Sequence, residues 1–432
     1  MSKAIALVAH DFPPYNVGGS QRPFLMSKSL MEAGMEVTVF TLTNDSYPSE
    51  KLNFKIDESK LKIIRTNIQP QKHSIFNKGH YFNLTDDIAS RWLPHLIKAI
   101  SRQHQESPFD YLFITCPPFS LAAQARKLSE KVGVPYILDF RDAWSQWIMT
   151  PFPTYFHYRR LLQIEKKAIQ NASFISSTSH QQINDFIKVH GKALKSKFIY
   201  APNGFNEYVG TTISNSDNDK IQIVYTGSFY FNPYSQSLQS KKWYKKKWYQ
   251  WLQYLPRVED WSYRSPLYFF KALNNLILQD QYFSSRIEVI FAGQKPDWFE
   301  QMVMDFNLLG NVKHIGFLDK TKVQPLLDQS DYLLITSSKI PGGKEYSVAG
   351  KTFEYIAYQK PILAFVSEGE QKEVLKKTGL AFFFNPDEIE ENVSKFKLIF
   401  ENKTALEINQ KGCDQFKIPN NHIKLISNLK DL

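Results

Sequence analysis

Short apolar runs alternate with helix-like segments along most of the chain, and this alternation restricts the fold more than any other feature. Residues 4–8 form the first apolar run, and a Pro/Gly loop separates it from a helical pattern at 22–33. Gly34 suits the end of that helix, and 36–40 form the next run. This order is typical of a parallel sheet covered by helices. We expect a further helix at 121–132 and strands at 111–114, 136–138, 174–176 and 198–200.

The same pattern restarts about halfway along the chain. Residues 202–205 (Pro-Asn-Gly-Phe) have turn composition, and the polar stretch 211–220 that follows reads as a linker. Beyond it we expect a helix at 266–278 and strands at 221–225, 287–291, 312–315, 332–335 and 361–366.

The chain of 432 residues is too long for one ordinary core. We therefore predict an α/β protein with two doubly wound, Rossmann-like domains at 1–205 and 206–415, facing a central cleft. Residues 416–432 are interpreted as a C-terminal helix able to cross back to the first domain. Ligands of open α/β sheets bind beyond the carboxyl ends of the strands, so we expect the cleft to hold the functional site.

Composition narrows the functional classes. The chain has two cysteines, Cys116 and Cys413, which supports neither a disulfide framework nor a cysteine metal site. No apolar run reaches the about 20 residues of a membrane-spanning helix, and the N-terminus leads into a strand rather than a signal peptide. We expect a cytoplasmic protein. The formal net charge of +11 favours an anionic partner.

The loop after the first strand contains two adjacent glycines, Gly18 and Gly19. Glycines between a strand and a helix let the backbone approach an anion such as a diphosphate. The alternative is a tight strand-to-helix turn. The fuller GxGxxG pattern is absent, which argues against a nicotinamide cofactor. His10, at the end of the first strand, is either an acceptor-side residue of the cleft or a structural histidine.

Three charged residues, Asp139, Arg141 and Asp142, follow a strand that we expect to be buried. Such charges must be paired or lie in a solvated cleft. One interpretation is a salt-bridged strand end. The other is that Asp142 or Arg141 positions an acceptor hydroxyl or a reacting sugar.

A glycine-rich loop at 340–350, which includes Gly342 and Gly343, precedes a helix that carries Lys351 and Glu354. A spacing of three residues places both side chains on one helix face. Loop amides and Lys351 suit a diphosphate, and Glu354 can accept hydrogen bonds from a ribose. The alternative is an exposed ion pair between Lys351 and Glu354.

Arg264 adds a cation just before the helix expected at 266–278. One charge-assisted hydrogen bond to a phosphate contributes about 1.5 to 3 kcal/mol. We therefore count Arg264 among the candidate phosphate-binding residues.

In their order and spacing these motifs resemble glycosyltransferase family 4, whose members are retaining enzymes of the GT-B fold. The resemblance implies a hexosyltransferase that uses a nucleotide diphosphate sugar, needs no other cofactor and no metal, and stabilises the leaving group electrostatically. The matching segments are 12–14 with Gly18 and Gly19, 139–144, 202–205, 225–228 and 350–355.

The resemblance also implies roles for single residues. Gly18, Gly19 and Gly227 would lie against the donor, Arg264 and Lys351 would balance the diphosphate charge, and Glu354 would hold the ribose. Family members usually carry a second acidic residue eight positions before the ribose-binding glutamate. That position is Tyr346 here, so the nearest acid, Glu345, is the candidate for the donor sugar. Many members also have a histidine near the position of Arg141 and Asp142, and this chain does not.

Residues 231–263 look like an insertion that concentrates lysine, tryptophan and tyrosine. Aromatic residues prefer the headgroup region, and each lysine near an anionic leaflet contributes about 1 kcal/mol. We predict that this segment docks the chain on the inner face of the cell membrane, next to a lipid-linked or other glycan acceptor. A lid or a dimer contact is the main alternative, and nucleic acid is not expected. The residues concerned are Lys241, Lys242, Lys245, Lys246 and Lys247 with Trp243, Tyr244, Trp248, Tyr249, Trp251 and Tyr254.

Two other functions fit parts of the sequence. A nucleotide-sugar epimerase can have the same two-domain fold, but it would need acid and base residues at a ring carbon. A non-catalytic membrane-binding or nucleic-acid-binding protein would fit the net charge of +11.

Overall fold

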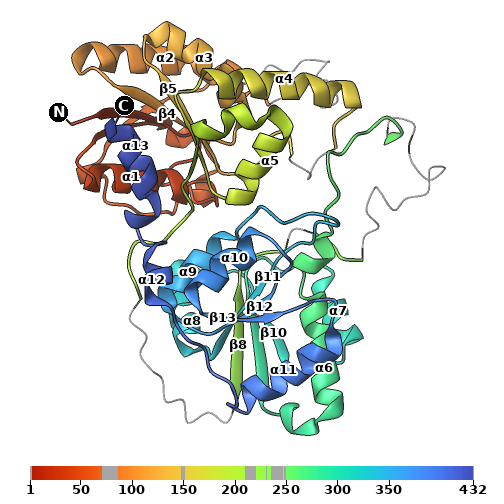
Figure 1. Ribbon diagram of the computed structural model, residues 1–432. Coiled ribbons are helices and arrows are strands. Elements are labelled where there is room, and N and C mark those ends of the chain that lie inside the picture. Colours follow the sequence, from red (N-terminus) through yellow and green to blue (C-terminus); the bar gives the residue numbers. More distant parts are fainter. Residues whose placement is uncertain are drawn as a thin grey trace. The chain divides into compact units, whose positions relative to one another are not determined.

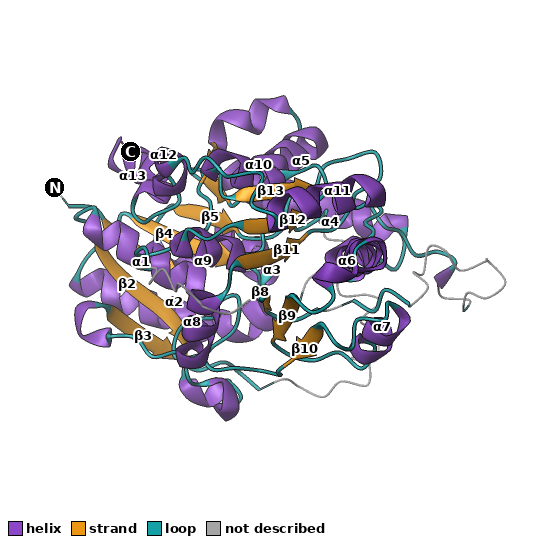
Figure 2. Ribbon diagram, turned by 90° about the horizontal axis from the view of Figure 1, so that it is seen from below, coloured by secondary structure: helices purple, strands orange, loops and turns teal. Residues whose placement is uncertain are grey.

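The computed structural model describes residues 2–70, 86–146, 151–209, 220–229, 231–234, 247 and 250–431. The chain divides into two compact units (Figure 1). The N-terminal unit comprises 1–206, 247–257 and 417–432, and the C-terminal unit comprises 207–246 and 258–416. Both are α/β units with parallel sheets, and in Figure 2 their strands (orange) are flanked by helices (purple).

The N-terminal unit contains a seven-stranded parallel sheet in the order β3-β2-β1-β4-β5-β6-β7. Its strands are β1 Ala4–Val8, β2 Glu36–Leu42, β3 Lys62–Thr66, β4 Tyr111–Cys116, β5 Tyr136–Phe140, β6 Ile175–Ser177 and β7 Phe198–Tyr200. Its helices are α1 Gln21–Glu32, α2 Ile88–Glu106, α3 Phe119–Val132, α4 Tyr155–Asn171, α5 His180–His190 and α13 Ile423–Asp431.

Alternate residues of the central strands face two separate cores, because successive strand side chains point to opposite faces. Ala6, Val8 and Leu112 lie in a cluster with residues of α2, α3 and α4. Ile5 and Phe113 lie in a second cluster with residues of α1 and α13. Helices on both faces explain why these strands read as continuous apolar runs. The C-terminal helix α13 therefore belongs to the core of the N-terminal unit.

A buried charge pair lies beneath the carboxyl ends of these strands. Arg22 donates to both oxygens of Asp139, from Nη2 at 2.6 Å and from Nε at 2.9 Å. The Arg22 and Asp139 side chains are 4% and 1% exposed. Burial would raise the pKa of Asp139, but Arg22 and the hydroxyls of Ser176 and Thr115 outweigh it and hold the pKa below its usual value. Asp139 is thus a structural charge, bound from two neighbouring strands and α1.

The C-terminal segment is fixed next to this pair. Asn421 Nδ2 donates to the Pro202 carbonyl oxygen at 3.1 Å, and His422 Nδ1 lies 2.9 Å from Ser29 Oγ. Burial and the nearby Arg22 lower the pKa of His422 to about 3, so the imidazole is neutral at ordinary pH. Residues 417–432 are held by polar contacts as well as by the apolar face of α13.

The C-terminal unit contains a six-stranded parallel sheet in the order β10-β9-β8-β11-β12-β13. Its strands are β8 Ile221–Thr226, β9 Ile287–Ala292, β10 Val312–His314, β11 Tyr332–Thr336, β12 Ile362–Phe365 and β13 Ala381–Phe384. Its helices are α6 Leu267–Gln279, α7 Phe299–Asp305, α8 Lys320–Gln329, α9 Gly350–Tyr358, α10 Glu370–Thr378, α11 Ile389–Phe400 and α12 Gln410–Asp414, with a 3-10 helix η8 at Trp261–Arg264.

The doubly wound α/β fold predicted from the sequence is confirmed for each unit. The unit boundaries differ from the prediction in one respect. We expected the whole segment 231–263 in the second domain, but 247–257 belong to the N-terminal unit. Two backbone hydrogen bonds between Phe152 and Tyr254, at 2.8 and 3.0 Å, attach this part of the segment.

Candidate functional site

The carboxyl edge of the C-terminal sheet is lined by glycine. Gly227 follows β8, Gly293 follows β9 and Gly316 lies beyond β10, with φ angles of 115°, 155° and 77°. A Cβ atom on Gly293 would lie 2.2 Å from the Gly227 carbonyl oxygen. Both the positive φ and this close approach require glycine. The backbone segments after β8 and β9 therefore pack directly against each other at this edge, which is the edge where ligands of open α/β sheets bind.

Lys351 lies directly against this glycine edge. Its Nζ atom is 3.4 Å from the centroid of the Tyr225 ring, a close cation–π contact. A Cβ atom on Gly227 would lie 2.8 Å from the same Nζ atom, so Gly227 makes room for the ammonium group. Burial lowers the pKa of Lys351 well below its usual value, Arg264 lowers it further, and Glu354 opposes the shift. A largely buried cation in such a position is suited to an incoming anion.

Arg264 supplies the second cation at this place. It ends η8 and precedes α6, with its guanidinium 5.0 Å from the centroid of the Trp261 ring. Nη2 donates to Ser347 Oγ at 3.3 Å. Repulsion between the two positive charges contributes to the lowered pKa of Lys351. Two neighbouring cations repel each other until an anion binds between or beside them.

Glu354 lies one helical turn beyond Lys351 on α9, and its side chain is exposed. It acts on the pKa of Lys351, which places it near the ammonium group. These residues, Lys351, Glu354, Arg264 and Gly227, are among those that the family resemblance assigned to one donor site. Gly293 was missed, and Tyr225 was given no role although it lies in the matching segment 225–228. Their place in the site follows from the pairing of β8 with β9, which a sequence does not display.

Glu345 occupies a different kind of position, because its carboxylate is in the interior and 1% exposed. Its Oε1 accepts from Ser338 Oγ at 2.8 Å and from Ser347 Oγ at 2.9 Å. Since Ser347 Oγ also accepts from Arg264, the carboxylate helps to orient that guanidinium. Glu345 therefore influences Arg264 through Ser347, and its buried carboxylate is not exposed at the surface of the unit. Gly342 and Gly343 lie in an exposed turn, closed by a hydrogen bond from Gly343 N to the Ile340 oxygen.

The N-terminal unit gathers polar groups at the carboxyl ends of β1, β4 and β5. Arg141 donates to the carbonyl oxygens of Gly19 and Pro117, so its guanidinium joins two loops. His10 Nδ1 lies 2.7 Å from Asp11 Oδ1, and their side chains are 18% and 22% exposed. A Cβ atom on Gly19 would lie 2.5 Å from Asp11 Oδ2 and 2.6 Å from Arg141 Nη1. Gly19 is therefore needed for close packing of these charges.

Asp11, Gly18 and Asp142 lie near this group in the N-terminal unit. Asp11 was missed, since a single acid after a strand gives no distinctive pattern. Gly18 has open space around it, and Asp142 is half-buried beyond β5. Among the residues that the structure describes, no group of three or more His, Cys, Asp or Glu side chains is placed to hold a metal ion.

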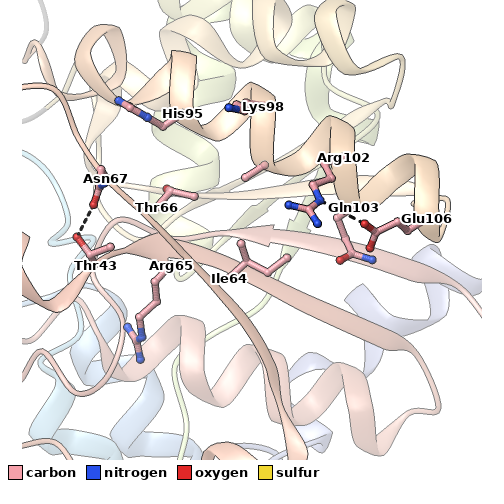
Figure 3. Close-up of a pocket in the computed structure, with 11 residues that line it drawn as sticks. Thr43, Ile64, Arg65, Thr66, Asn67, His95, Lys98, Arg102, Gln103 and Glu106 are labelled. Carbon is pink, nitrogen blue, oxygen red and sulfur yellow. Dashed lines mark hydrogen bonds and ion pairs between the residues drawn. The ribbon is translucent and has the colours of Figure 1, made fainter.

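A separate cavity of about 470 Å³ lies between β3 and α2 of the N-terminal unit (Figure 3). His95, Lys98 and Arg102 come from one face of α2, and Arg102 pairs with Glu106 at 3.3 Å. No candidate residue from the sequence lies in it. Its remaining lining residues are Thr43, Ile64, Arg65, Thr66, Asn67, Ala99 and Gln103.

Comparisons with known proteins agree with this architecture. The model of the family "Glycosyl transferase 4-like domain" matches residues 18–204. No curated protein sequence matches the chain. A sucrose-phosphate synthase from Thermosynechococcus elongatus has a similar structure, with a TM-score of 0.61, 13% identity, and coverage of 99% of this chain and 98% of that one.

Two further solved structures are similar over their whole length. HepE from Anabaena, in complex with UDP, gives a TM-score of 0.58 at 13% identity and covers 100% of both chains. The lipopolysaccharide outer core galactosyltransferase WaaB gives 0.55 at 11% identity and covers 99% of both chains. At these identities the likeness shows the fold, which is GT-B as predicted.

Proposed function

We propose a donor, a reaction and an acceptor for this chain, which is a glycosyltransferase of the GT-B fold with a glycosyl transferase 4-like domain at residues 18–204. The donor is a nucleoside diphosphate sugar, bound by the C-terminal unit. The reaction moves its hexose, with retention of configuration, to a lipid-linked or cell-surface glycan precursor. The observation that carries the donor assignment is the position of the Lys351 ammonium group between Tyr225 and Gly227.

The donor assignment follows from charge and access. Lys351 and Arg264 are close enough to interact, and the glycine edge beside Lys351 carries no side chains. A diphosphate would neutralise both cations and accept hydrogen bonds from them. The exposed carboxylate of Glu354 can accept hydrogen bonds from ribose hydroxyls. The similarity to a structure solved with UDP supports this class of donor.

The reaction needs charge stabilisation at the leaving group. The bond between the anomeric carbon and the β-phosphate oxygen breaks, and the acceptor hydroxyl oxygen forms the new bond to that carbon. The proton of the hydroxyl passes to the departing diphosphate. Lys351 and Arg264 stabilise the charge that develops on the diphosphate, which is the largest single contribution in reactions of this type. Retention is proposed from the family resemblance.

Replacing Glu354 with glutamine tests the donor site. Glutamine keeps the shape but weakens the hydrogen bonds to a ribose, so we expect the KM for the donor to rise about 2- to 10-fold with an unchanged melting temperature. Glu373→Gln, on the exposed surface of α10, is the control and should behave like the parent chain. Transfer should be measured at subsaturating donor. Parent-like donor use by Glu354→Gln would remove Glu354 from the site, and conversion of the donor sugar without transfer would favour an epimerase.

Treatment with EDTA tests the proposed independence from metal. Lys351 and Arg264 supply the positive charge that a divalent ion supplies in other transferases, so transfer should be unchanged within error after chelation. The measurement is the initial rate before and after EDTA, with MgCl₂ added back. A loss of activity that magnesium or manganese restores would contradict this proposal.

The proposed acceptor rests on one structural neighbour and on the composition of one segment of the chain. WaaB, by its name, acts on lipopolysaccharide, and a lipid-linked glycan would require the enzyme to reach a membrane surface. No helix among the described residues is long and apolar enough to cross a membrane. Segment 231–263, predicted to dock on the inner face, is described at 231–234, 247 and 250–263. Its residues Lys241, Lys242, Trp243, Tyr244, Lys245, Lys246, Trp248 and Tyr249 lie outside the described residues.

A further inference from the structure

One surface helix of the N-terminal unit, α4, carries several cations that have no acidic partner among the residues that the structure describes. The inner face of α4 is buried through Tyr158, Leu161 and Glu165. The outer face carries four cations with exposed side chains: Arg159, Arg160, Lys166 and Lys167. The one acidic residue of α4, Glu165, is fully buried and pairs with His190. The outer face of α4 is therefore purely basic.

Four other helices differ from α4 in this respect. Helices α2, α3, α10 and α11 each carry a cation that pairs with an acid one turn away, whereas none of the four cations of α4 makes an ion pair within the described part of the chain. Unscreened cations on one face attract an anionic partner. The paired examples are Arg102 with Glu106, Arg126 with Glu130, Lys372 with Glu368 and Lys395 with Glu391.

Exposed apolar side chains gather at the N-terminal end of the same helix. Phe156, on the basic face, is 74% exposed, and Tyr155 beside it is 52% exposed. The ring of Tyr254 packs on Tyr155 with centroids 5.0 Å apart. Tyr254 thereby brings Trp251 and Leu252, which are 59% and 70% exposed, to this end of α4.

The attached segment is held firmly to the N-terminal unit. Tyr254 also packs on Tyr158 at 4.8 Å, and Arg257 donates to Asp185 on α5 at 2.7 Å. Together with the backbone pairing to Phe152, these contacts hold the segment at the N-terminal end of α4. The combined surface, which we call the α4 face, consists of Phe156, Arg159, Arg160, Lys166, Lys167, Trp251 and Leu252.

We propose that the α4 face binds the headgroup region of an anionic lipid bilayer. Four cations would contact anionic headgroups, while Phe156, Trp251 and Leu252 would insert at one end. Leu252 favours a bilayer over a nucleic acid as the partner. Its exposed aliphatic side chain would be stabilised by entering hydrocarbon, but it has no ring on which a base can stack. The α4 face lies on the unit with the proposed acceptor-side residues His10 and Arg141. The proposal deepens the proposed acceptor, but the binding itself requires no substrate.

The test uses the full chain and two kinds of vesicle, one of phosphatidylcholine alone and one of phosphatidylcholine with phosphatidylglycerol. The parent chain should cosediment with the anionic vesicles at low salt, and salt should weaken the binding. Changing Arg159, Arg160, Lys166 and Lys167 together to glutamine should lower the affinity at least about tenfold. The matched control makes the same charge change at Lys313, Lys372, Lys376 and Lys395, which are ion-paired in the C-terminal unit.

A second pair of variants separates insertion from charge. Phe156→Ser with Leu252→Ser should weaken vesicle binding, whereas Leu309→Ser with Phe317→Ser, equally exposed in the C-terminal unit, should not. Three results would overturn the proposal: no binding of anionic vesicles by the parent, parent-like binding by the glutamine variant, or displacement of vesicles by a single-stranded oligonucleotide that binds more tightly. Hydrolysis of the donor in solution, measured without vesicles, should be unchanged in all four variants. This assay tests the donor assignment independently of vesicle binding.

Discussion

Replacing Lys351 with alanine should lower kcat/KM for the donor about 10- to 100-fold, the range that one charge-assisted hydrogen bond to a phosphate accounts for. The reason is the position of Nζ over Tyr225, at the edge where Gly227 carries no side chain. The fold should survive, because the ammonium group is costly to bury and alanine removes that cost. Lys372→Ala, on the surface of α10, should retain parent-like kinetics.

The same residue gives the reaction an alkaline limit. Because burial lowers the pKa of Lys351 in the free enzyme, the ammonium group loses its proton at a pH where an ordinary lysine keeps it. A bound diphosphate favours the ammonium form and raises the pKa again. Between the two pKa values donor binding takes up a proton, so donor affinity should fall as the pH rises through the lowered pKa. In Lys351→Arg this dependence should disappear, since guanidinium stays charged.

These two results can be obtained by isothermal titration of UDP and by transfer rates over the same pH range. An unaltered kcat/KM in Lys351→Ala, or an alkaline loss that persists in Lys351→Arg, would show that another group binds the diphosphate. Measured melting temperatures keep a folding defect from being mistaken for a binding defect.

The residues proposed to bind the donor could be predicted from the sequence only where they lie close together in the chain. Lys351 and Glu354 are three residues apart, so helical periodicity alone placed them on one face. The contact of Lys351 with Tyr225 and Gly227 depends on how α9 packs against β8, more than a hundred residues earlier in the chain. Packing of this kind is set by tertiary structure, and no pattern within a short window predicts it.

The three charges at the carboxyl end of β5, Asp139, Arg141 and Asp142, were also only partly predictable, because Asp139 lies within the strand and the other two follow it. The sequence indicated that they must be paired or solvated, and the structure distinguishes them. Asp139 is buried against Arg22, while Arg141 donates to backbone oxygens of two loops. Arg22 is more than a hundred residues away from Asp139, so the pairing was not visible in the sequence. The strands themselves were predicted because burial on both faces produces long apolar runs.

The segment 231–263 was assigned to the second domain because of its place in the chain order. Its residues 247–257 instead belong to the N-terminal unit, and the backbone pairing of Phe152 with Tyr254 explains why. An isolated two-strand pairing leaves no periodic signal, since it involves one residue on each side. The concentration of lysine and aromatic residues was visible, but the basic face of α4 was overlooked. Its four cations are interrupted in the sequence by buried residues and come together only on the helix surface.

The buried pair in the N-terminal unit leads to the last prediction, which has the largest expected effect on stability. Replacing Arg22 with leucine leaves the Asp139 carboxylate buried and without its guanidinium partner. Loss of one member of a buried pair costs about 3 to 5 kcal/mol, because the remaining charge is not solvated. Arg22 also donates to Asn203 Oδ1 at 3.1 Å, which adds to the loss. Urea unfolding should show this decrease in the transition of the N-terminal unit.

The double variant Arg22→Leu with Asp139→Leu distinguishes an unpaired charge from a general packing defect. If the buried charge is the cause, removal of the carboxylate should recover much of the lost free energy of unfolding. Both variants carry leucine at position 22, so the change in size there does not contribute to the difference between them. Arg126→Leu breaks an exposed pair with Glu130 and should cost less than about 1 kcal/mol. A double variant that is less stable than Arg22→Leu would mean that the serine and threonine donors, rather than Arg22, hold the Asp139 carboxylate in place. In the double variant the hydroxyls of Thr115 and Ser176 lose the Asp139 carboxylate to which both donate. Arg22→Leu alone keeps that acceptor.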